Sequence, residues 1–184
     1  MINRTEGLNI VNQYLKNKNL KKHSLAVEAI LKAMAVKLQK DTELWALTGL
    51  LHDIDYEFTK ENPENHGTMS SEILEDMLPE EAINAIKAHN YQHTMYIPQT
   101  RLDKALIAAD AVSGLIIAAA LIMPSKKLED VTLKTLQKKY KDKSFASGCN
   151  RKRIDLCIDN GFELDEFLNL SLNALKTISN ELEL

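Results

Sequence analysis

Apolar side chains recur along most of the chain at the three- and four-residue spacing of amphipathic α-helices. The clearest stripe runs from Leu20 to Leu38 and contains one histidine, His23, among aliphatic residues. The next segment, residues 44–51, is apolar on nearly every side, which predicts a fully buried helix. Asp41 or Thr42 would cap that helix, and it leads directly into His52 and Asp53.

Turn residues and proline divide the rest of the chain into further helices. A loop with Asn62, Pro63 and Gly67 precedes a helix over about residues 68–77. Pro79 opens another predicted helix, which carries His89 and extends toward His93 before Pro98. The remaining helices are predicted over about residues 106–123, 128–140, 151–160 and 164–182. No segment shows the alternation of a strand. The pattern predicts an all-α protein with about nine helices and no sheet.

Composition narrows the class of protein. The chain has 184 residues, 45% of them hydrophobic, and a net charge of −3. This length predicts a single domain over residues 1–184, and this charge gives no reason to expect nucleic-acid binding. The N-terminus lacks the apolar core of a signal peptide, and Cys149 and Cys157 form no CxxC motif. We therefore expect a cytoplasmic protein with reduced thiols.

One segment could be mistaken for a membrane span. Residues 106–123 are apolar except for Asp110 and Ser113. Because a carboxylate near the centre of a bilayer is costly, we expect the buried central helix of a bundle and no membrane partner. A buried Asp110 needs a counter-charge, and no basic residue lies between Lys104 and Lys126. Its partner is then a metal cation or a basic residue from a distant helix, unless Asp110 caps a helix or bonds a tyrosine.

Histidines lie on the apolar faces of three predicted helices, at His23, His52 and His89. A single histidine in a core is usually a structural residue, but three that point inward from separate helices are typical of a metal site in a bundle. With Asp53 and Asp110 they form a mixed nitrogen and oxygen set. Such a set suits Mn, Fe, Co, Ni, Zn or Mg, and its open positions for water and substrate indicate a metallohydrolase.

The order of these residues resembles a known family. His23 is followed after 29 residues by the pair His52-Asp53, and Asp110 follows after a further 57. With the sequence Leu-Leu-His-Asp-Ile-Asp over residues 50–55, this arrangement resembles the HDIG-type HD-domain superfamily of metal-dependent phosphohydrolases, in a bacterial branch. The resemblance covers about residues 18–125. It implies an HD-domain-like helical bundle with additional C-terminal helices over about residues 126–184.

The resemblance also implies ligands for one or two divalent metal ions per chain. The first ion would be held by His23, His52, Asp53 and Asp110. In two-metal members, histidines after the doublet hold a second ion; here His66 and His89 occupy such places and Asp53 would bridge.

The chain departs from the family pattern at three points. Asn90 stands where some members have the second histidine of a pair, which leaves His93 as an alternative ligand. Tyr56 stands where a lysine often follows the doublet. The Gly-Tyr-Pro signature of cyclic dinucleotide phosphodiesterases is absent, so we set that activity aside.

Phosphate ester hydrolysis also needs a proton acceptor and positive charge near phosphate. The candidate catalytic residues near the doublet are Asp53, Asp55, Glu57, Glu64 and His66. The candidates for binding phosphate are basic residues of the C-terminal third, namely Lys126, Lys127, Lys141, Lys143, Arg151 and Arg153. The turn over residues 143–148 is a further candidate for anion binding. Solvated surface charge is the alternative role for all of these groups.

Together these features predict a divalent-metal-dependent phosphohydrolase, either a phosphomonoesterase or a phosphodiesterase. Metal-bound water would attack phosphorus in a small phosphorylated molecule, for which a nucleotide is favoured, and the chain could form an oligomer. One alternative is a non-catalytic HD-fold module that binds metal or nucleotide and regulates a partner. Another is an all-α interaction protein, which would purify without stoichiometric metal.

Overall fold

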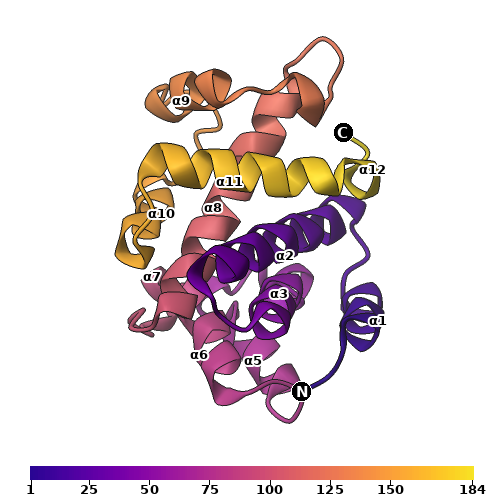
Figure 1. Ribbon diagram of the computed structural model, residues 1–184. Coiled ribbons are helices and arrows are strands. Elements are labelled where there is room, and N and C mark those ends of the chain that lie inside the picture. The colour runs from indigo at the N-terminus through magenta and orange to yellow at the C-terminus, as the bar shows by residue number, and fades with distance from the viewer.

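The computed structural model describes residues 1–184 as helices and connecting segments with no β-strand, which confirms the all-α prediction (Figure 1). The longer helices are α1 (Arg4–Tyr14), α2 (Lys18–Leu38), α3 (Thr42–Leu51), α5 (Thr68–Leu74), α6 (Glu80–His89), α8 (Arg101–Leu121), α9 (Leu133–Lys141) and α11 (Leu164–Thr177). The short segments are α4 (Tyr56–Thr59), η1 (Pro63–Asn65), α7 (Tyr91–Thr94), η2 (Leu128–Asp130), α10 (Arg151–Ile154), η3 (Asp155–Asn160) and α12 (Ser179–Leu182).

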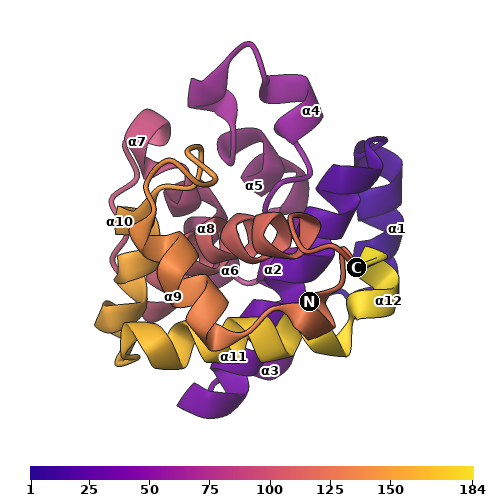
Figure 2. The same ribbon diagram turned by 90° about the horizontal axis from the view of Figure 1, so that it is seen from above.

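Helices α2 and α8 form the centre of the bundle. α2 packs against α3, α8 and α11, and α8 also packs against α6, α9, α10 and η3. Figure 2, seen from above, shows α8 surrounded by the other elements. α8 has the length and composition of a membrane span, but 67% of its most apolar window is buried within the protein. It is therefore the buried central helix that the sequence predicted.

A glycine allows α2 and α3 to approach each other closely. A Cβ atom added to Gly49 would lie 2.9 Å from both the carbonyl carbon and the carbonyl oxygen of Val27. Real Cβ atoms do not approach backbone this closely, so any larger residue would push the two helices apart. Because α2 carries His23 and α3 ends at His52, this contact also sets the distance between two of the predicted ligands.

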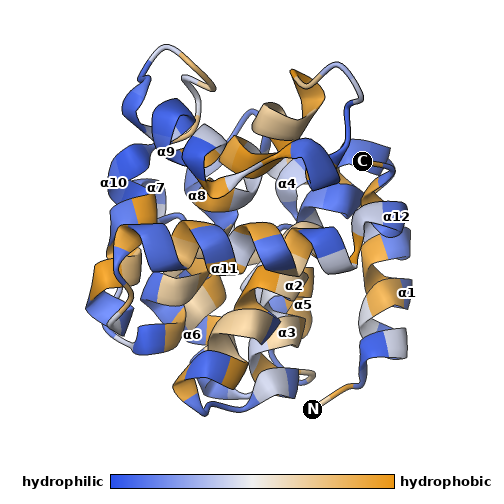
Figure 3. Cartoon of the chain, turned by 45° about the horizontal axis from the view of Figure 1, so that its top comes forward, coloured by the Kyte–Doolittle hydropathy of each residue, from blue (hydrophilic) through white to orange (hydrophobic).

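The C-terminal third packs into the same core as the rest of the chain. One cluster of buried apolar residues extends from Val11 to Leu182. On α11 the buried residues include Phe167, Leu168 and Leu172, which share one face of that helix. Figure 3 shows apolar positions of α11 alternating with hydrophilic ones, and a largely hydrophilic α9. The predicted C-terminal extension is thus a layer over α2 and α8.

Several helix boundaries differ from the prediction. The helix opened by Pro79 ends at His89, because Asn90 leaves the helical conformation and α7 starts a separate turn. The three predicted C-terminal helices are each divided, into η2 and α9, α10 and η3, and α11 and α12. Gly161 ends η3 with a φ of +88°. Helix α1 was not predicted, since it buries only Gly7 and Val11 and so has little apolar pattern.

Candidate metal centre

Four imidazoles surround the carboxylate of Asp53. Its Oδ1 lies 3.2 Å from Nε2 of His52, 3.3 Å from Nε2 of His66 and 3.4 Å from Nε2 of His89, and its Oδ2 lies 3.5 Å from Nε2 of His23. The five residues come from α2, the end of α3, the turn before α5 and the end of α6. The structure therefore brings together histidines that lie as far as 66 residues apart in the sequence.

Asp53 belongs to two overlapping groups of potential ligands. Ligand atoms of His23, His52 and Asp53 lie within 4.8 Å of one another, and so do those of Asp53, His66 and His89. Asp110 joins the first group, because its Oδ1 lies 3.2 Å from Nε2 of His23. A shared carboxylate between two groups has the geometry of a bridging ligand.

The partners of the outer ring nitrogens fix two of these imidazoles. Nδ1 of His52 lies 2.8 Å from the carbonyl oxygen of Gly49, and Nδ1 of His89 lies 2.5 Å from that of Ile86. Because a carbonyl oxygen only accepts, each Nδ1 carries the proton in the neutral ring and each Nε2 presents a lone pair to the centre. An outer hydrogen bond of this kind orients most metal-ligating histidines in proteins.

The other two imidazoles are held in the same way by side chains. Nδ1 of His66 lies 2.9 Å from Oδ1 of Asp55. Nδ1 of His23 lies 3.1 Å from the Ser113 hydroxyl, which itself donates to the backbone carbonyl of Asp110. Since that hydroxyl proton is used, the serine oxygen accepts from His23. All four Nε2 atoms therefore face the centre.

The environment of His52 fits a cation in the first group. The ring is fully buried, its Nε2 has no hydrogen-bond partner, and burial lowers its pKa to about 4. A neutral ring whose Nδ1 donates to a carbonyl places a lone pair 3.2 Å from a carboxylate oxygen. Two facing acceptors repel each other unless a cation lies between them. The residues present therefore fit a divalent metal ion.

Electrostatics in the second group lead to the same conclusion. Nε2 of His66 and Nε2 of His89 lie 3.0 Å apart, and each ring donates its other nitrogen outward. Although burial opposes a charge on His66, its bonds to Asp53 and Asp55 raise its pKa to about 10. Burial likewise opposes ionisation of Asp53, yet the surrounding imidazoles hold its pKa well below the ordinary value. Without metal, a proton on His66 supplies the missing positive charge.

Asp55, one of the catalytic candidates, holds the turn that presents His66. Its buried carboxylate accepts from Nδ1 of His66 and from the backbone N–H groups of Gly67 and Ser70, at 2.9, 2.7 and 2.9 Å. These bonds occupy both oxygens. Gly67 has a φ of +85°, and a Cβ there would lie 2.7 Å from the carbonyl oxygen of Ile86. The turn that presents His66 therefore requires glycine at this position.

Glu57 does not reach the cluster. Its carboxylate lies on the outer side of α4 and accepts from the backbone N–H groups of Lys16 and Asn17. His93 lies on α7, exposed at the edge of the cavity beside the cluster. Glu57 is thus a link to the segment before α2, and His93 faces solvent beside the cluster without joining it.

Among the predicted phosphate-binding residues, Lys126, Lys127, Lys143 and Arg151 make no contact with the cluster. Lys126 and Lys127 follow the end of α8, which lies about 16 Å along the helix axis from Asp110 at 1.5 Å per residue. Lys143 is exposed in the loop that follows α9. The guanidinium of Arg151 donates to backbone carbonyls only, those of Lys139, Tyr140, Asp142, Phe145, Ala146 and Cys149. Arg151 therefore fixes the loop over residues 142–149.

The counter-charge of Asp110 is Arg153, which sequence analysis could name only as one of several basic residues. Nη2 of Arg153 lies 2.7 Å from Oδ2 of Asp110 and 2.9 Å from the carbonyl oxygen of His89. Burial opposes ionisation of Asp110, but Arg153 and His23 hold its pKa well below the ordinary value. Because Arg153 lies 43 residues beyond Asp110, no local sequence pattern could identify the pair.

Two cavities reach the cluster from different sides. One, of about 360 Å³, is almost entirely polar, and its lining beyond the cluster includes Tyr56, Lys60, Asn90 and His93. The other, of about 330 Å³, lies beside His23 and is lined on one side by the loop that Arg151 holds, at Ala146, Gly148 and Cys149. Asp110 and Arg153 line both cavities. A small polar molecule has room to reach the ligand atoms.

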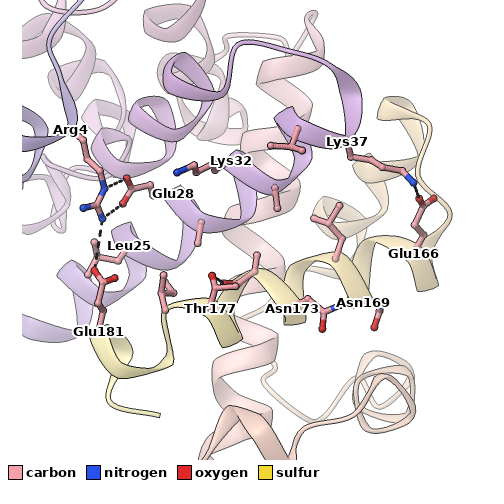
Figure 4. Close-up of a pocket in the computed structure, with 16 residues that line it drawn as sticks. Arg4, Leu25, Glu28, Lys32, Lys37, Glu166, Asn169, Asn173, Thr177 and Glu181 are labelled. Carbon is pink, nitrogen blue, oxygen red and sulfur yellow. Dashed lines mark hydrogen bonds and ion pairs between the residues drawn. The ribbon is translucent and has the colours of Figure 1, made fainter.

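The largest cavity, about 860 Å³, lies elsewhere, between α2 and α11 (Figure 4). It contains none of the clustered histidines. The figure shows most of its charged side chains in ion pairs: Arg4 contacts Glu28 at 2.6 Å and Glu181 at 3.8 Å, and Lys37 contacts Glu166 at 3.0 Å, while Lys32 takes part in none of them. No set of lone pairs converges there, so size alone does not make this groove the functional site.

Comparison with known proteins gives one match. The family model described as HD domain matches residues 20–115, a segment that contains all four clustered histidines and both aspartates. No curated protein and no solved structure matches the chain.

Proposed function

The chain belongs to the HD domain family, and from this premise we propose that it is a divalent-metal-dependent phosphohydrolase acting on a small phosphorylated molecule, with nucleotides as the favoured class. The family and the cluster indicate a metal-dependent hydrolase. The observation that carries the proposal is the convergence of four Nε2 atoms on the buried carboxylate of Asp53, with the partly buried carboxylate of Asp110 beside His23. Facing acceptors repel one another unless positive charge lies between them, and a metal ion or the proton of His66 supplies that charge.

We assign a first metal ion to His23, His52, Asp53 and Asp110, and a second to His66 and His89, with Asp53 shared. When bound, such ions lower the pKa of water and neutralise charge on a phosphoryl oxygen. The protein's own contribution is to hold the ligands rigidly through Gly49, Ser113, Asp55 and Ile86. Because the outer bonds are made before metal binds, little reorganisation is needed at that step.

The polar cavity supports a phosphorylated substrate. Lys60 and Arg153 supply positive charge on its wall, and Asn90 and His93 offer further polar groups. Attack by water on phosphorus needs a proton acceptor on one side and a neutralised leaving oxygen on the other. In this cavity His93 is the exposed imidazole placed to exchange protons with a departing group. Asp55 and Glu57 have no such access.

The proposal is tested by metal analysis followed by an activity screen. Protein purified without chelator is analysed for Mn, Fe, Co, Ni, Zn and Mg, then assayed with each metal against mono-, di- and cyclic nucleotides and sugar phosphates. We expect stoichiometric metal and hydrolysis of the phosphate ester in at least one class. Asp53→Asn is the matched inactive control, and it also removes the signal of a contaminating phosphatase from the comparison.

Each outcome of this screen has a distinct meaning. Bound metal without turnover of any ester would favour a non-catalytic binding or regulatory module. Absence of metal after incubation with every ion would favour an interaction protein and refute the proposal. Activity on monoesters alone, or on diesters alone, would resolve the type of esterase.

A further inference from the structure

Arg153 stands out among the basic residues of the chain. It lies on α10, 38 residues beyond the end of the family match at residue 115, yet its guanidinium contacts the Asp110 carboxylate at the cluster. It lines both cavities that reach the cluster. The C-terminal extension therefore contributes a charged group to a site whose candidate metal ligands all lie within the matched segment.

The hydrogen bonds of this guanidinium are incomplete. Its protein contacts at Asp110 and at the carbonyl of His89 both use Nη2, and its Nε is buried without a partner. An arginine has five N–H donors, and a buried donor without a partner is costly, most of all when it is charged. The open donors of Arg153 therefore call for an acceptor that the protein does not provide.

Arg151 provides an internal comparison two residues away. All three of its nitrogens donate to backbone carbonyls of residues 139–149, so it is fully used as a structural arginine. By fixing that loop, it also fixes the start of α10 and hence the direction of Arg153. The loop in turn lines the cavity beside His23. Arg151 thus holds the backbone position from which Arg153 faces the site.

We propose that Arg153 binds the phosphoryl group of the substrate, with its unused donors pairing with phosphoryl oxygens beside Asp110. This inference rests on the proposed function and extends it by naming the anion-binding group. The planar guanidinium fork matches two oxygens of a phosphate and is charged at any physiological pH. Its contact with Asp110 keeps it at the centre of the site. Lys60, on the wall of the polar cavity, adds a second positive charge.

The test measures binding of inorganic phosphate, which needs no knowledge of the natural substrate. Manganese-loaded wild type, Arg153→Gln, Arg153→Lys and Lys152→Gln are titrated with inorganic phosphate by calorimetry, and metal content and thermal midpoint are measured for each. Lys152 is the matched control, because it is the exposed neighbour on the same short helix. We expect the dissociation constant of Arg153→Gln to rise about 10- to 100-fold, the scale of a lost charged hydrogen bond. Arg153→Lys should be intermediate, since it keeps the charge and loses the fork, and Lys152→Gln should match wild type.

Three results separate this inference from its alternatives. An unchanged phosphate dissociation constant in metal-loaded Arg153→Gln would overturn it. Loss of metal from that variant, with normal phosphate affinity in the fraction that remains loaded, would make Arg153 a positioning residue for Asp110 and overturn it as well. Weakened phosphate binding in Arg153→Gln, combined with a wild type that hydrolyses no ester, would support this inference while contradicting the proposed hydrolase. Should Arg153→Gln fail to fold, the lysine variant decides, because wild-type phosphate affinity there would show that the fork has no role.

Discussion

Replacing Gly49 by alanine tests whether the contact between α2 and α3 controls both stability and the metal centre. Gly49 lies inside α3, where alanine would normally stabilise a helix by about 1 kcal/mol. The structure predicts the opposite sign, because the added Cβ would lie 2.9 Å from two backbone atoms of Val27 and 3.0 Å from the backbone nitrogen of Glu28. None of these atoms belongs to a flexible side chain, so the helices themselves must separate.

The magnitude follows from the size of that displacement. Ordinary contacts begin near 3.4 Å, so α3 must move by about half an ångström across a well-packed interface. Overpacking of this kind costs about 1–3 kcal/mol, and the helix-propensity gain of about 1 kcal/mol leaves a net loss of up to about 2 kcal/mol, which for a chain of this length lowers the thermal midpoint by up to about 8 °C. The same movement separates His23 on α2 from Asp53 after α3, whose ligand atoms lie 3.5 Å apart. Metal affinity should therefore fall together with stability.

Gly114→Ala is the matched control. Gly114 also lies inside a helix, α8, but it is exposed and nothing lies within 4 Å of a Cβ atom added to it. Helix propensity alone should then raise the thermal midpoint by about 2–4 °C. Differential scanning calorimetry with and without EDTA, followed by metal titration, measures both effects. A midpoint for Gly49→Ala equal to or above that of Gly114→Ala, which carries the same gain in helix propensity, would refute the steric argument.

Three further predictions concern the cluster itself. Asp53→Asn should reduce bound metal to near zero by elemental analysis, because the shared charge is lost while the shape is kept; full occupancy would contradict its place as a ligand. His66→Gln or His89→Gln should each lower the metal count from about two per chain toward one and reduce activity about 10- to 100-fold; a count near one in all three proteins would instead indicate a mononuclear enzyme. In EDTA, the raised pKa of His66 means that its proton stabilises the fold fully below its ordinary value of 6.5 and that this contribution is lost as pH rises through about 10. The thermal midpoint of wild type should fall over that interval and that of His66→Gln should fall less, and parallel curves would exclude His66 as the source.

Sequence was sufficient for the fold class and for the members of the cluster. The helical spacing of apolar residues made inward-facing histidines visible at His23, His52 and His89, and the family resemblance added His66. Whether these side chains meet depends on tertiary contacts such as that of Gly49 with Val27. The structure supplies those contacts, and it places each Nε2 toward Asp53.

The roles of charged residues outside the cluster were harder to predict. Asp55 and Arg151 were both candidates for chemistry, yet their hydrogen bonds are used to hold the His66 turn and the loop over residues 142–149. A charged residue that satisfies backbone groups has the same sequence signature as one that faces a substrate. The two roles are distinguished only by the number of hydrogen-bond partners that the charged group has within the protein, as the contrast between Arg151 and Arg153 shows.

The ligand groups of the centre are drawn from α2, α3, the turn before α5, α6 and α8, so the unfolded chain holds no comparable set close together. An ion held there acts as a non-covalent cross-link between these elements and binds the native state alone. At a free metal concentration one hundred times the dissociation constant, such linkage stabilises the native state by about 2.7 kcal/mol. Metal supply would then govern how long the whole bundle survives proteolysis, in addition to whether its centre is active.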